Sequence, residues 1–207
     1  LRGNLAVREA LEWMWPVLTP AQLLHDLYGS RALLRSANAG HFTDAQIQLL
    51  HRARSPHADE VVWRFQDVPL LDEARAHLGY RPGKRKEDAL RTYGHICVDE
   101  AQDLSPMELR MVSRRSLNGS MTVVGDIAQA TGAWANSEWD QILAALPERH
   151  VSHRRELTVG YRIPEATMEL AGRVLPHAAP GLQLPRAIRG GGDVPRIVAV
   201  TGTLEQA

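Results

Sequence analysis

Two acidic side chains, Asp99 and Glu100, stand directly after a short apolar run at residues 96–98. Ser105 and Glu108 follow with the spacing of a helix capping box, so the expected order is buried strand, acidic tip, helix. Ligands of open α/β sheets bind beyond the carboxyl ends of such strands. An aspartate there is suited to hold Mg²⁺, and the glutamate to orient or deprotonate the water that attacks a γ-phosphate. The alternative is an exposed acidic turn after a core strand.

A second strand with a polar tip is expected further along the chain. The apolar residues 121–124 end at Gly125 and Asp126, and Gln129 comes three residues after Asp126. A helix over residues 105–117 would join the two strands into a βαβ unit, whose right-handed crossover brings both acidic tips to one crevice. Gln129 is then able to reach into this crevice and sense the γ-phosphate or its water.

A third strand is expected at residues 157–159, followed by a helix over residues 164–175. Arg162 lies between them, and an arginine just beyond a strand end is well placed to stabilise charge on a transferring phosphoryl group. The alternative for Arg162 is a surface ion pair. The Pro- and Gly-rich residues 176–192 are expected to be a connector, and residues 196–200 a last strand.

The first ninety residues show the capping signals and apolar spacing of short helices, and no alternating run typical of strands. We therefore expect a small helical subdomain or insertion. Trp13, Trp15 and Trp63 are most simply core residues, with stacking on bases or on a partner as the alternative. The helices are expected at residues 4–15, 19–27, 31–36, 43–50 and 67–78.

Composition and charge exclude several classes of protein. The 207 residues are 44% hydrophobic, which is ordinary for a soluble globular protein. Their formal net charge is +0, so the chain shows no overall basic excess typical of nucleic-acid binding.

The one cysteine, Cys97, excludes an internal disulfide and is expected to be a buried, reduced thiol. No membrane span or signal peptide is evident, so the cytoplasm is the expected location. Because the sequence starts at Leu1 and ends at Ala207 without a natural stop, we expect a fragment of a longer protein.

Residues 79–85 have the composition of a phosphate-binding loop but not its spacing. Their glycines are one residue too close, and Arg85 stands where a serine or threonine should ligate Mg²⁺. We expect a solvated loop there, with contact to a nucleic-acid backbone as the alternative. No Gly-x-x-x-x-Gly-Lys-Ser/Thr motif is present in the sequence, so the chain lacks the lysine that holds the β- and γ-phosphates.

The polar tips resemble the motifs of a known family. DEAQD at residues 99–103, VGDIAQ at residues 124–129 and GYR at residues 160–162 are similar, in order and spacing, to motifs II, III and IV of UvrD/Rep-like superfamily 1 helicases. The resemblance is strongest over about residues 91–175. Within that superfamily the chain is most similar to HelD-type proteins, which bind RNA polymerase and use ATP to free it from nucleic acid and recycle it. The stretches that carry this second resemblance are residues 12–19, 104–107, 120–126, 128–132 and 179–182.

The resemblance implies an α/β fold with two RecA-like domains and ATP in the cleft between them. The chain would hold a mainly helical subdomain or insertion at residues 1–90, the later part of the first RecA-like domain at 91–150, and the start of the second at 151–207. The boundary would lie near residues 150–156. We therefore expect a fragment of a RecA-like P-loop NTPase, a parallel sheet with flanking helices preceded by a helical subdomain.

The resemblance also implies roles for the polar tips. Asp99 would bind Mg²⁺, and Glu100 would be the catalytic base in the ATP site. Gln129 would couple the state of the nucleotide to movement, and Arg162 would touch the γ-phosphate from the second domain. The cofactors would be ATP and Mg²⁺.

Two departures from the family pattern affect the expected activity. Motifs I, V and VI are not present, so the chain alone should not hydrolyse ATP. UvrD-like proteins carry an aromatic residue three positions after the motif III glutamine, where it stacks on a base of single-stranded DNA, and here that position is Gly132. Loss of one stacking ring removes about 1–3 kcal/mol of binding. A later aromatic, Trp134, is either a ring that contacts nucleic acid or a partner, or a core residue under the loop.

Three functions remain as hypotheses. The first is a HelD-type, ATP-hydrolysing motor that remodels or releases RNA polymerase from nucleic acid. The second is a UvrD/Rep-like ATP-dependent DNA helicase or translocase in DNA repair, which binds DNA without sequence specificity. The third is a non-catalytic module that docks on a partner. The intact motif residues argue against the third, and Gly132 with the neutral charge argues against the second. None of the three involves a membrane.

Overall fold

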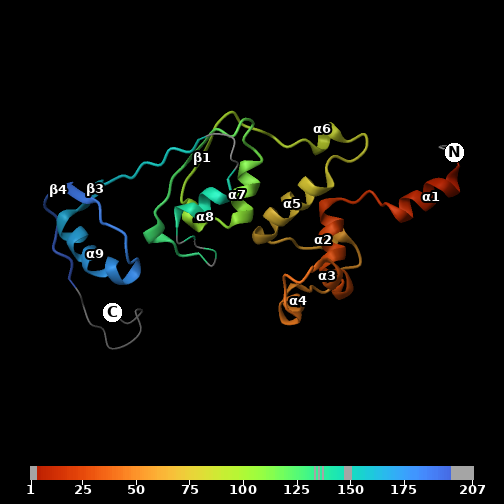
Figure 1. Cartoon of the computed structure of the whole chain (residues 1–207), viewed down its shortest axis with the longest axis horizontal. Coiled ribbons are helices and arrows are strands. Elements are labelled where there is room, and N and C mark those ends of the chain that lie inside the picture. The colour runs from red at the N-terminus through yellow and green to blue at the C-terminus, as the bar shows by residue number, and fades with distance from the viewer. Residues whose placement is uncertain (1–3, 133, 135, 137, 147–150, 197–207) are drawn as a thin grey trace.

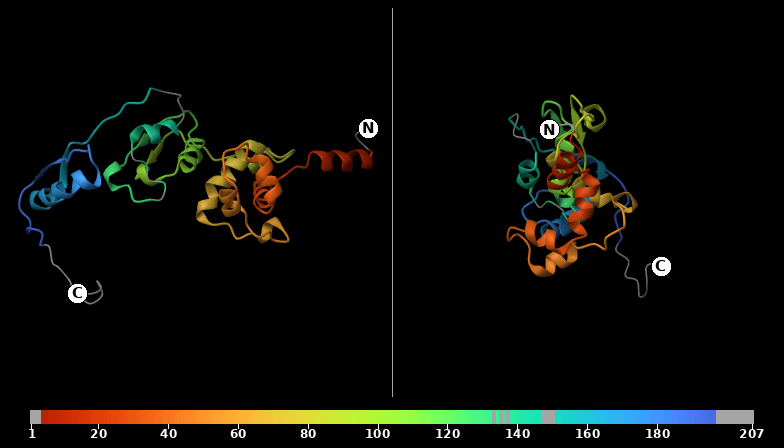
Figure 2. Two further views of the ribbon diagram at one scale, coloured as in Figure 1. Left: turned by 60° about the horizontal axis from the view of Figure 1, so that its bottom comes forward. Right: turned by 90° about the vertical axis from the view of Figure 1, so that its right-hand side faces the viewer.

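The computed structural model of the chain describes residues 4–132, 134, 136, 138–146 and 151–196. Three groups of elements follow one another along the chain: a helical group, a small α/β unit and a strand–helix–strand unit (Figure 1). The same order is seen from two other directions in Figure 2. Helices combined with small parallel sheets make the fold α/β, as expected. Within the described ranges, no helix is long and apolar enough to cross a membrane.

The helical group is formed by the first ninety residues. Its helices begin at caps that are visible in the sequence: Asn4 caps the first helix, and Thr19 and Thr43 form capping boxes with the glutamines three residues later. Each cap satisfies backbone N–H groups that the first helical turn leaves without partners. The elements are α1 (Leu5–Met14), α2 (Pro20–Tyr28), α3 (Arg31–Ala37), α4 (Asp44–Leu50), η1 (Ala58–Glu60), η2 (Phe65–Asp67), α5 (Val68–Leu78) and α6 (Arg85–Asp88).

A small apolar core holds four of these helices together. Leu24, Leu34, Ile47 and Ala74 are buried in the group, one each from α2, α3, α4 and α5. Helix α2 contacts both α3 and α5, and α3 contacts α4. The core is small, so polar contacts between the helices and their connecting loops contribute to holding the group in one arrangement.

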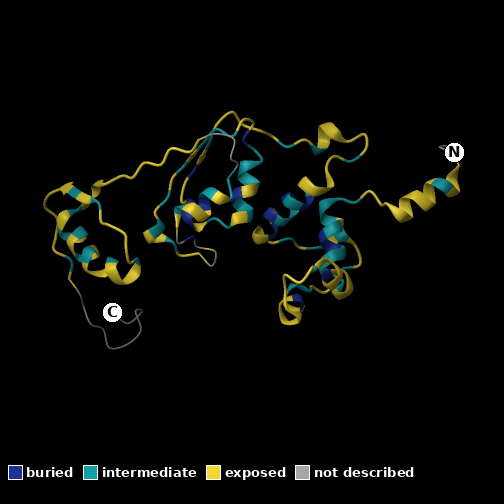
Figure 3. Ribbon diagram, viewed as in Figure 1, coloured by how far each residue is buried: buried dark blue, intermediate teal, exposed yellow. Residues whose placement is uncertain are grey.

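Helix α1 lies outside this core. It contains no buried residue, and Figure 3 shows it exposed over most of its length. Trp13 and Trp15 are 86% and 85% exposed, so the interpretation of these two rings as core residues is wrong. Trp63 is half-buried.

The α/β unit is built on two parallel strands with a helical crossover. Val98, Ala101, Leu109 and Ile142 form its buried core. The strands pair with Cys97 opposite Thr122, which confirms the expected strand–helix–strand unit. Its elements are β1 (Ile96–Val98), η3 (Ala101–Asp103), α7 (Pro106–Ser113), β2 (Met121–Val123), η4 (Ile127–Gln129) and α8 (Trp139–Ala144).

Cys97 is exposed, and the expectation of a buried thiol is wrong. Successive side chains of a strand point to opposite faces of a sheet. Ile96 and Val98 pack on the core formed with α7 and α8, so Cys97 between them faces the other way. A continuous apolar run is typical of a strand covered on both faces, whereas this sheet packs its core on the face that carries Ile96 and Val98.

The last unit contains two parallel strands that flank one helix in sequence. Its elements are β3 (Val159–Pro164), α9 (Glu165–Ala178) and β4 (Arg186–Arg189). β3 is longer than the strand expected at residues 157–159, and it includes Arg162. β4 lies within residues 176–192, so the interpretation of that whole stretch as a connector is wrong. The strand expected at residues 196–200 lies outside the described residues apart from its first position.

Candidate functional site

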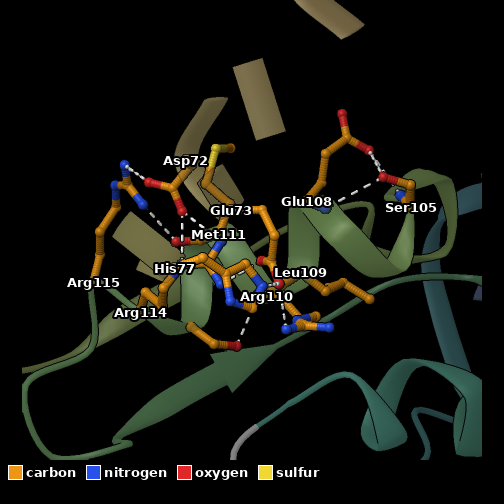
Figure 4. A network of polar contacts seen from close by, with 11 residues as sticks. Asp72, Glu73, His77, Ser105, Glu108, Leu109, Arg110, Met111, Arg114 and Arg115 are labelled. Carbon is orange, nitrogen blue, oxygen red and sulfur yellow. Dashed lines mark hydrogen bonds and ion pairs between the residues drawn. The ribbon is translucent and has the colours of Figure 1, made fainter. Parts of the chain in front are cut away.

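The chain turns sharply at the carboxyl end of β1. Asp99 and Glu100 follow the strand, η3 comes next, and α7 begins after Ser105. Ser105 Oγ accepts the Glu108 N–H at 3.2 Å, and the Glu108 carboxylate accepts the Ser105 N–H at 2.7 Å (Figure 4). This capping box fixes the start of α7, so the predicted order of strand, acidic tip and helix is confirmed.

Glu100 has a strained backbone. Its φ of 50° and ψ of 40° lie in the left-handed region, which costs a residue with a side chain about 1–3 kcal/mol. The Glu100 N–H donates to Asp99 Oδ1 at 2.9 Å, which ties the two acidic residues together. Backbone strain of this kind concentrates at functional sites, and here it falls on the residue expected to be the base.

Gln102 connects the two polar tips. Its side chain is 1% exposed; Nε2 donates to Glu100 Oε2 at 2.7 Å, and Oε1 accepts the Asp126 N–H at 2.9 Å. A Cβ atom at Gly125 would lie 2.4 Å from Gln102 Oε1, so the bridge requires glycine at that position. Gln102 is not among the site residues predicted from the sequence. The available signal was a polar amide beside the small apolar Ala101, within a loop that must pack against the second strand end.

The second tip forms a compact polar turn. Asp126 Oδ1 accepts the Ala128 N–H at 3.0 Å, which caps η4. Asp126 Oδ2 accepts a hydrogen bond from Gln129 Nε2 at 2.7 Å. Since β1 and β2 are parallel and end side by side, the structure brings Asp99, Glu100 and Gln129 to the same edge of the sheet, as the sequence predicted.

The chain beyond Gln129 is also held by the first loop. Asp103 Oδ1 accepts the N–H groups of Thr131 and Gly132 at 3.0 and 3.2 Å. Further on, the buried Asn136 donates its backbone N–H to the Gln102 carbonyl at 2.9 Å, and Nδ2 to the Leu104 carbonyl at 2.9 Å. Both ends of this segment are therefore attached to the acidic loop.

Trp134 lies between these two attachment points. Its ring is 71% exposed, which disagrees with the interpretation of this residue as part of the core.

Arg162 is not close to the acidic tips in this structure. It is exposed on β3, and Figures 1 and 2 both show β3 apart from β1. Its carbonyl accepts a hydrogen bond from Arg189 Nη1 at 3.4 Å. No ion pair of Arg162 is found among the described residues, so the structure does not support the surface-pair alternative.

A charged cluster attaches α7 to the helical group. Asp72 and Glu73 of α5 face three arginines on and just after α7 (Figure 4). Asp72 contacts Arg114 Nη2 at 2.6 Å and Arg115 Nη2 at 2.7 Å, while Glu73 contacts Arg114 Nη1 at 2.7 Å and also pairs with Arg110. The Asp72 side chain is only 4% exposed. The helix that follows the acidic loop is thus fixed to α5 by buried and half-buried charge.

Comparison with protein families identifies the domain that carries these loops. The model of the UvrD/REP helicase N-terminal domain matches residues 36–149, which is more than half of the chain. The chain belongs to this family. Membership points to helicase-like, ATP-dependent activity. The matched range includes Asp99, Glu100, Gln129 and Trp134 and ends before Arg162. No curated protein matches the sequence at a significant level.

Proposed function

We propose that the chain is the acidic half of an ATP site in a superfamily 1 motor of the HelD type, which uses ATP to remodel RNA polymerase or release it from nucleic acid. One observation carries the ATPase assignment: Gln102 bridges Glu100 and the Asp126 turn, so the two polar tips form a single hydrogen-bonded unit. The HelD-type assignment is supported by the similar sequence stretches and by Gly132 at the position of a base-stacking aromatic.

The residues at this edge fit ATP with Mg²⁺. Mg²⁺ prefers oxygen ligands and is commonly bound by one or two carboxylates together with substrate phosphates and water. Asp99 is exposed, and its Oδ1 accepts the Glu100 N–H; within the part of the chain that the structure describes, no hydrogen bond is found to Oδ2, which leaves that oxygen for a cation. When bound, Mg²⁺ would neutralise charge on the β- and γ-phosphates.

Glu100 is the proposed base for the attacking water. Its Oε2 accepts the Gln102 amide, which restricts rotation of the carboxylate and leaves Oε1 for the water. Glu100 would take a proton from this water as the water oxygen bonds to the γ-phosphorus. Gln129 would report the presence of the γ-phosphate through its hydrogen bond to Asp126.

Arg162 would complete the site from a second RecA-like domain. Its exposure, and the absence of an ion-pair partner among the described residues, leave its guanidinium available for a phosphate. Closure of two domains around a nucleotide brings such a residue to the γ-phosphate, and hydrolysis releases it. The phosphate-binding loop is not among the 207 residues, so the proposed activity needs a longer protein that supplies it.

A comparison of two activators tests this function. The ATPase rate of the longer protein is measured with single-stranded DNA and with core RNA polymerase at one fixed salt concentration. The proposal predicts tight polymerase binding and little stimulation by DNA.

Strong stimulation by DNA alone would instead make the protein a UvrD/Rep-like DNA helicase or translocase. The exposed Trp134 ring favours this second candidate, because it is available to stack on a base. If the longer protein hydrolyses no ATP under any of these conditions, the non-catalytic binding module would be the remaining hypothesis.

A further inference from the structure

The segment between α5 and β1, residues 79–93, is rich in exposed basic side chains. It contains five basic and two acidic residues, in a chain whose formal net charge is +0. We call it the 79–93 segment. Its basic residues are Arg81, Lys84, Arg85, Lys86 and Arg91.

The two acidic residues of the segment are already paired within it. Asp88 accepts hydrogen bonds from the Arg81 side chain, among them Nη2 to Oδ1 at 2.6 Å and Nε to Oδ2 at 3.0 Å. The Arg81 side chain lowers the pKa of Asp88 to about 2, so Asp88 is ionised and remains paired at neutral pH. Glu87 pairs with Lys84 at 2.8 Å.

Three cations remain without a carboxylate partner among the described residues. Arg85, Lys86 and Arg91 are all exposed. Arg85 lies over the ring of Tyr80, with 5.7 Å from its guanidinium carbon to the ring centre, and Arg91 lies over Tyr93 at 5.4 Å. The rings are themselves 55% and 44% exposed. Two of the three cations therefore stack on aromatic rings that remain partly exposed.

The segment has a defined place in the fold. The Tyr93 N–H donates to the Arg115 carbonyl at 2.8 Å, and the Leu117 N–H donates to the Tyr93 carbonyl at 2.9 Å, so Tyr93 extends the line of β1. Asp99 is six residues further along the chain, just beyond the carboxyl end of β1. The segment thus lies at the amino end of β1, at the opposite edge from the acidic tips.

We propose that the 79–93 segment binds the phosphate backbone of a single-stranded nucleic acid, at the edge of the α/β unit opposite the ATP site. Free cations neutralise phosphates, and exposed rings stack on unpaired bases, which a duplex keeps inside its helix. An acidic protein partner would use the cations but leave the rings without a matching flat group. This binding does not require ATP and does not depend on the function proposed above.

The test measures binding of the 207-residue chain to a fluorescent oligothymidylate about 12 nucleotides long over a range of salt concentrations. Neutralisation of three phosphates predicts a slope of about −2 for the logarithm of the binding constant against the logarithm of salt concentration. The triple variant Arg85→Glu, Lys86→Glu, Arg91→Glu should lose this slope and bind at least about 100-fold more weakly at low salt.

A matched control separates this site from a general effect of charge. Arg8→Glu, Arg31→Glu, Arg186→Glu makes the same change in net charge at three exposed arginines elsewhere, and should bind like the wild type. Tyr80→Ala should weaken binding about tenfold, whereas Tyr80→Phe should not. Thermal unfolding confirms that each variant is folded.

Three results would overturn the proposal. They are equal losses in the two triple variants, equal affinity for heparin and for the oligonucleotide, and equal affinity for a duplex of the same length. Because ATP is absent throughout, a negative result would leave the proposed ATPase function untouched.

Discussion

Replacing Gln102 by glutamate places a second carboxylate against Glu100 without changing the size of the side chain. The wild-type amide donates to Glu100 Oε2 at 2.7 Å and accepts the Asp126 N–H. A glutamate carboxylate at position 102 can still accept the Asp126 N–H, but when it is ionised it cannot donate to Glu100. At this distance, with an effective dielectric constant of about 20, two ionised carboxylates repel each other by about 6 kcal/mol. The pair therefore retains one proton at neutral pH.

A shared proton prevents Glu100 from acting as a base. We expect kcat of the Gln102→Glu variant to fall about 100-fold at neutral pH and to recover as the pH rises. The assay is steady-state ATP hydrolysis by the longer protein from mildly acidic to alkaline pH, together with thermal unfolding. Gln46→Glu is the matched control, because it makes the same chemical change in a capping box that accepts glutamate equally well.

Two outcomes would refute this reasoning. A wild-type kcat and pH profile in the Gln102→Glu variant would mean that Gln102 does not contact the base in the working enzyme. An equal loss at every pH, together with a lower unfolding temperature, would mean that Gln102 only supports the fold.

Three further predictions follow from the charges of the structure. Arg162→Ala should lower kcat more than nucleotide affinity, and an unchanged kcat would remove Arg162 from the site. Asp72→Ala should lower the free energy of unfolding by about 3 kcal/mol in urea titrations, because it leaves the half-buried Arg115 without a carboxylate partner and Arg114 with Glu73 alone. Arg173→Ala, which breaks an exposed pair, should cost about 0.5 kcal/mol or less. The hydrogen bond from Arg52 lowers the pKa of Asp67 below its ordinary 3.8, so ionised Asp67 contributes stability above that pH and loses it as the pH falls through the lower folded-state pKa. Asp67→Asn should remove this acid dependence of the urea midpoint, and an unchanged dependence would assign it to other groups.

The strand, acidic tip and helix around Asp99 were predictable because local chemistry determines them. A capping box with proline at the first helical position fixes where α7 starts, whatever the rest of the chain does. The parallel pairing of β1 and β2 follows from a helix that is long enough to make the crossover. The meeting of Glu100 and Gln129 at one edge could therefore be inferred from spacing alone.

The role of Gln102 was not predictable in the same way. It depends on how closely Gly125 approaches, more than twenty residues later in the chain, and local patterns carry no information on that approach. β4 was missed for a similar reason. Its short sequence lies among prolines and glycines, and it becomes a strand because the Arg186 N–H donates to the Thr158 carbonyl at 2.8 Å. The exposure of Cys97 depends on which face of the sheet is covered, which an apolar run of three residues does not reveal.

Glu100 is the proposed base of the ATP site, and the Glu100→Gln variant tests this role most directly. The variant keeps the size of the side chain and removes only the ability to take a proton. The measurement compares nucleotide binding and single-turnover hydrolysis in the longer protein, with Gln46→Glu as an unaffected control. We expect unchanged ATP affinity and a hydrolysis rate lower by about 10²–10⁴-fold. Normal turnover in Glu100→Gln would contradict the assignment of this acidic tip as the catalytic site.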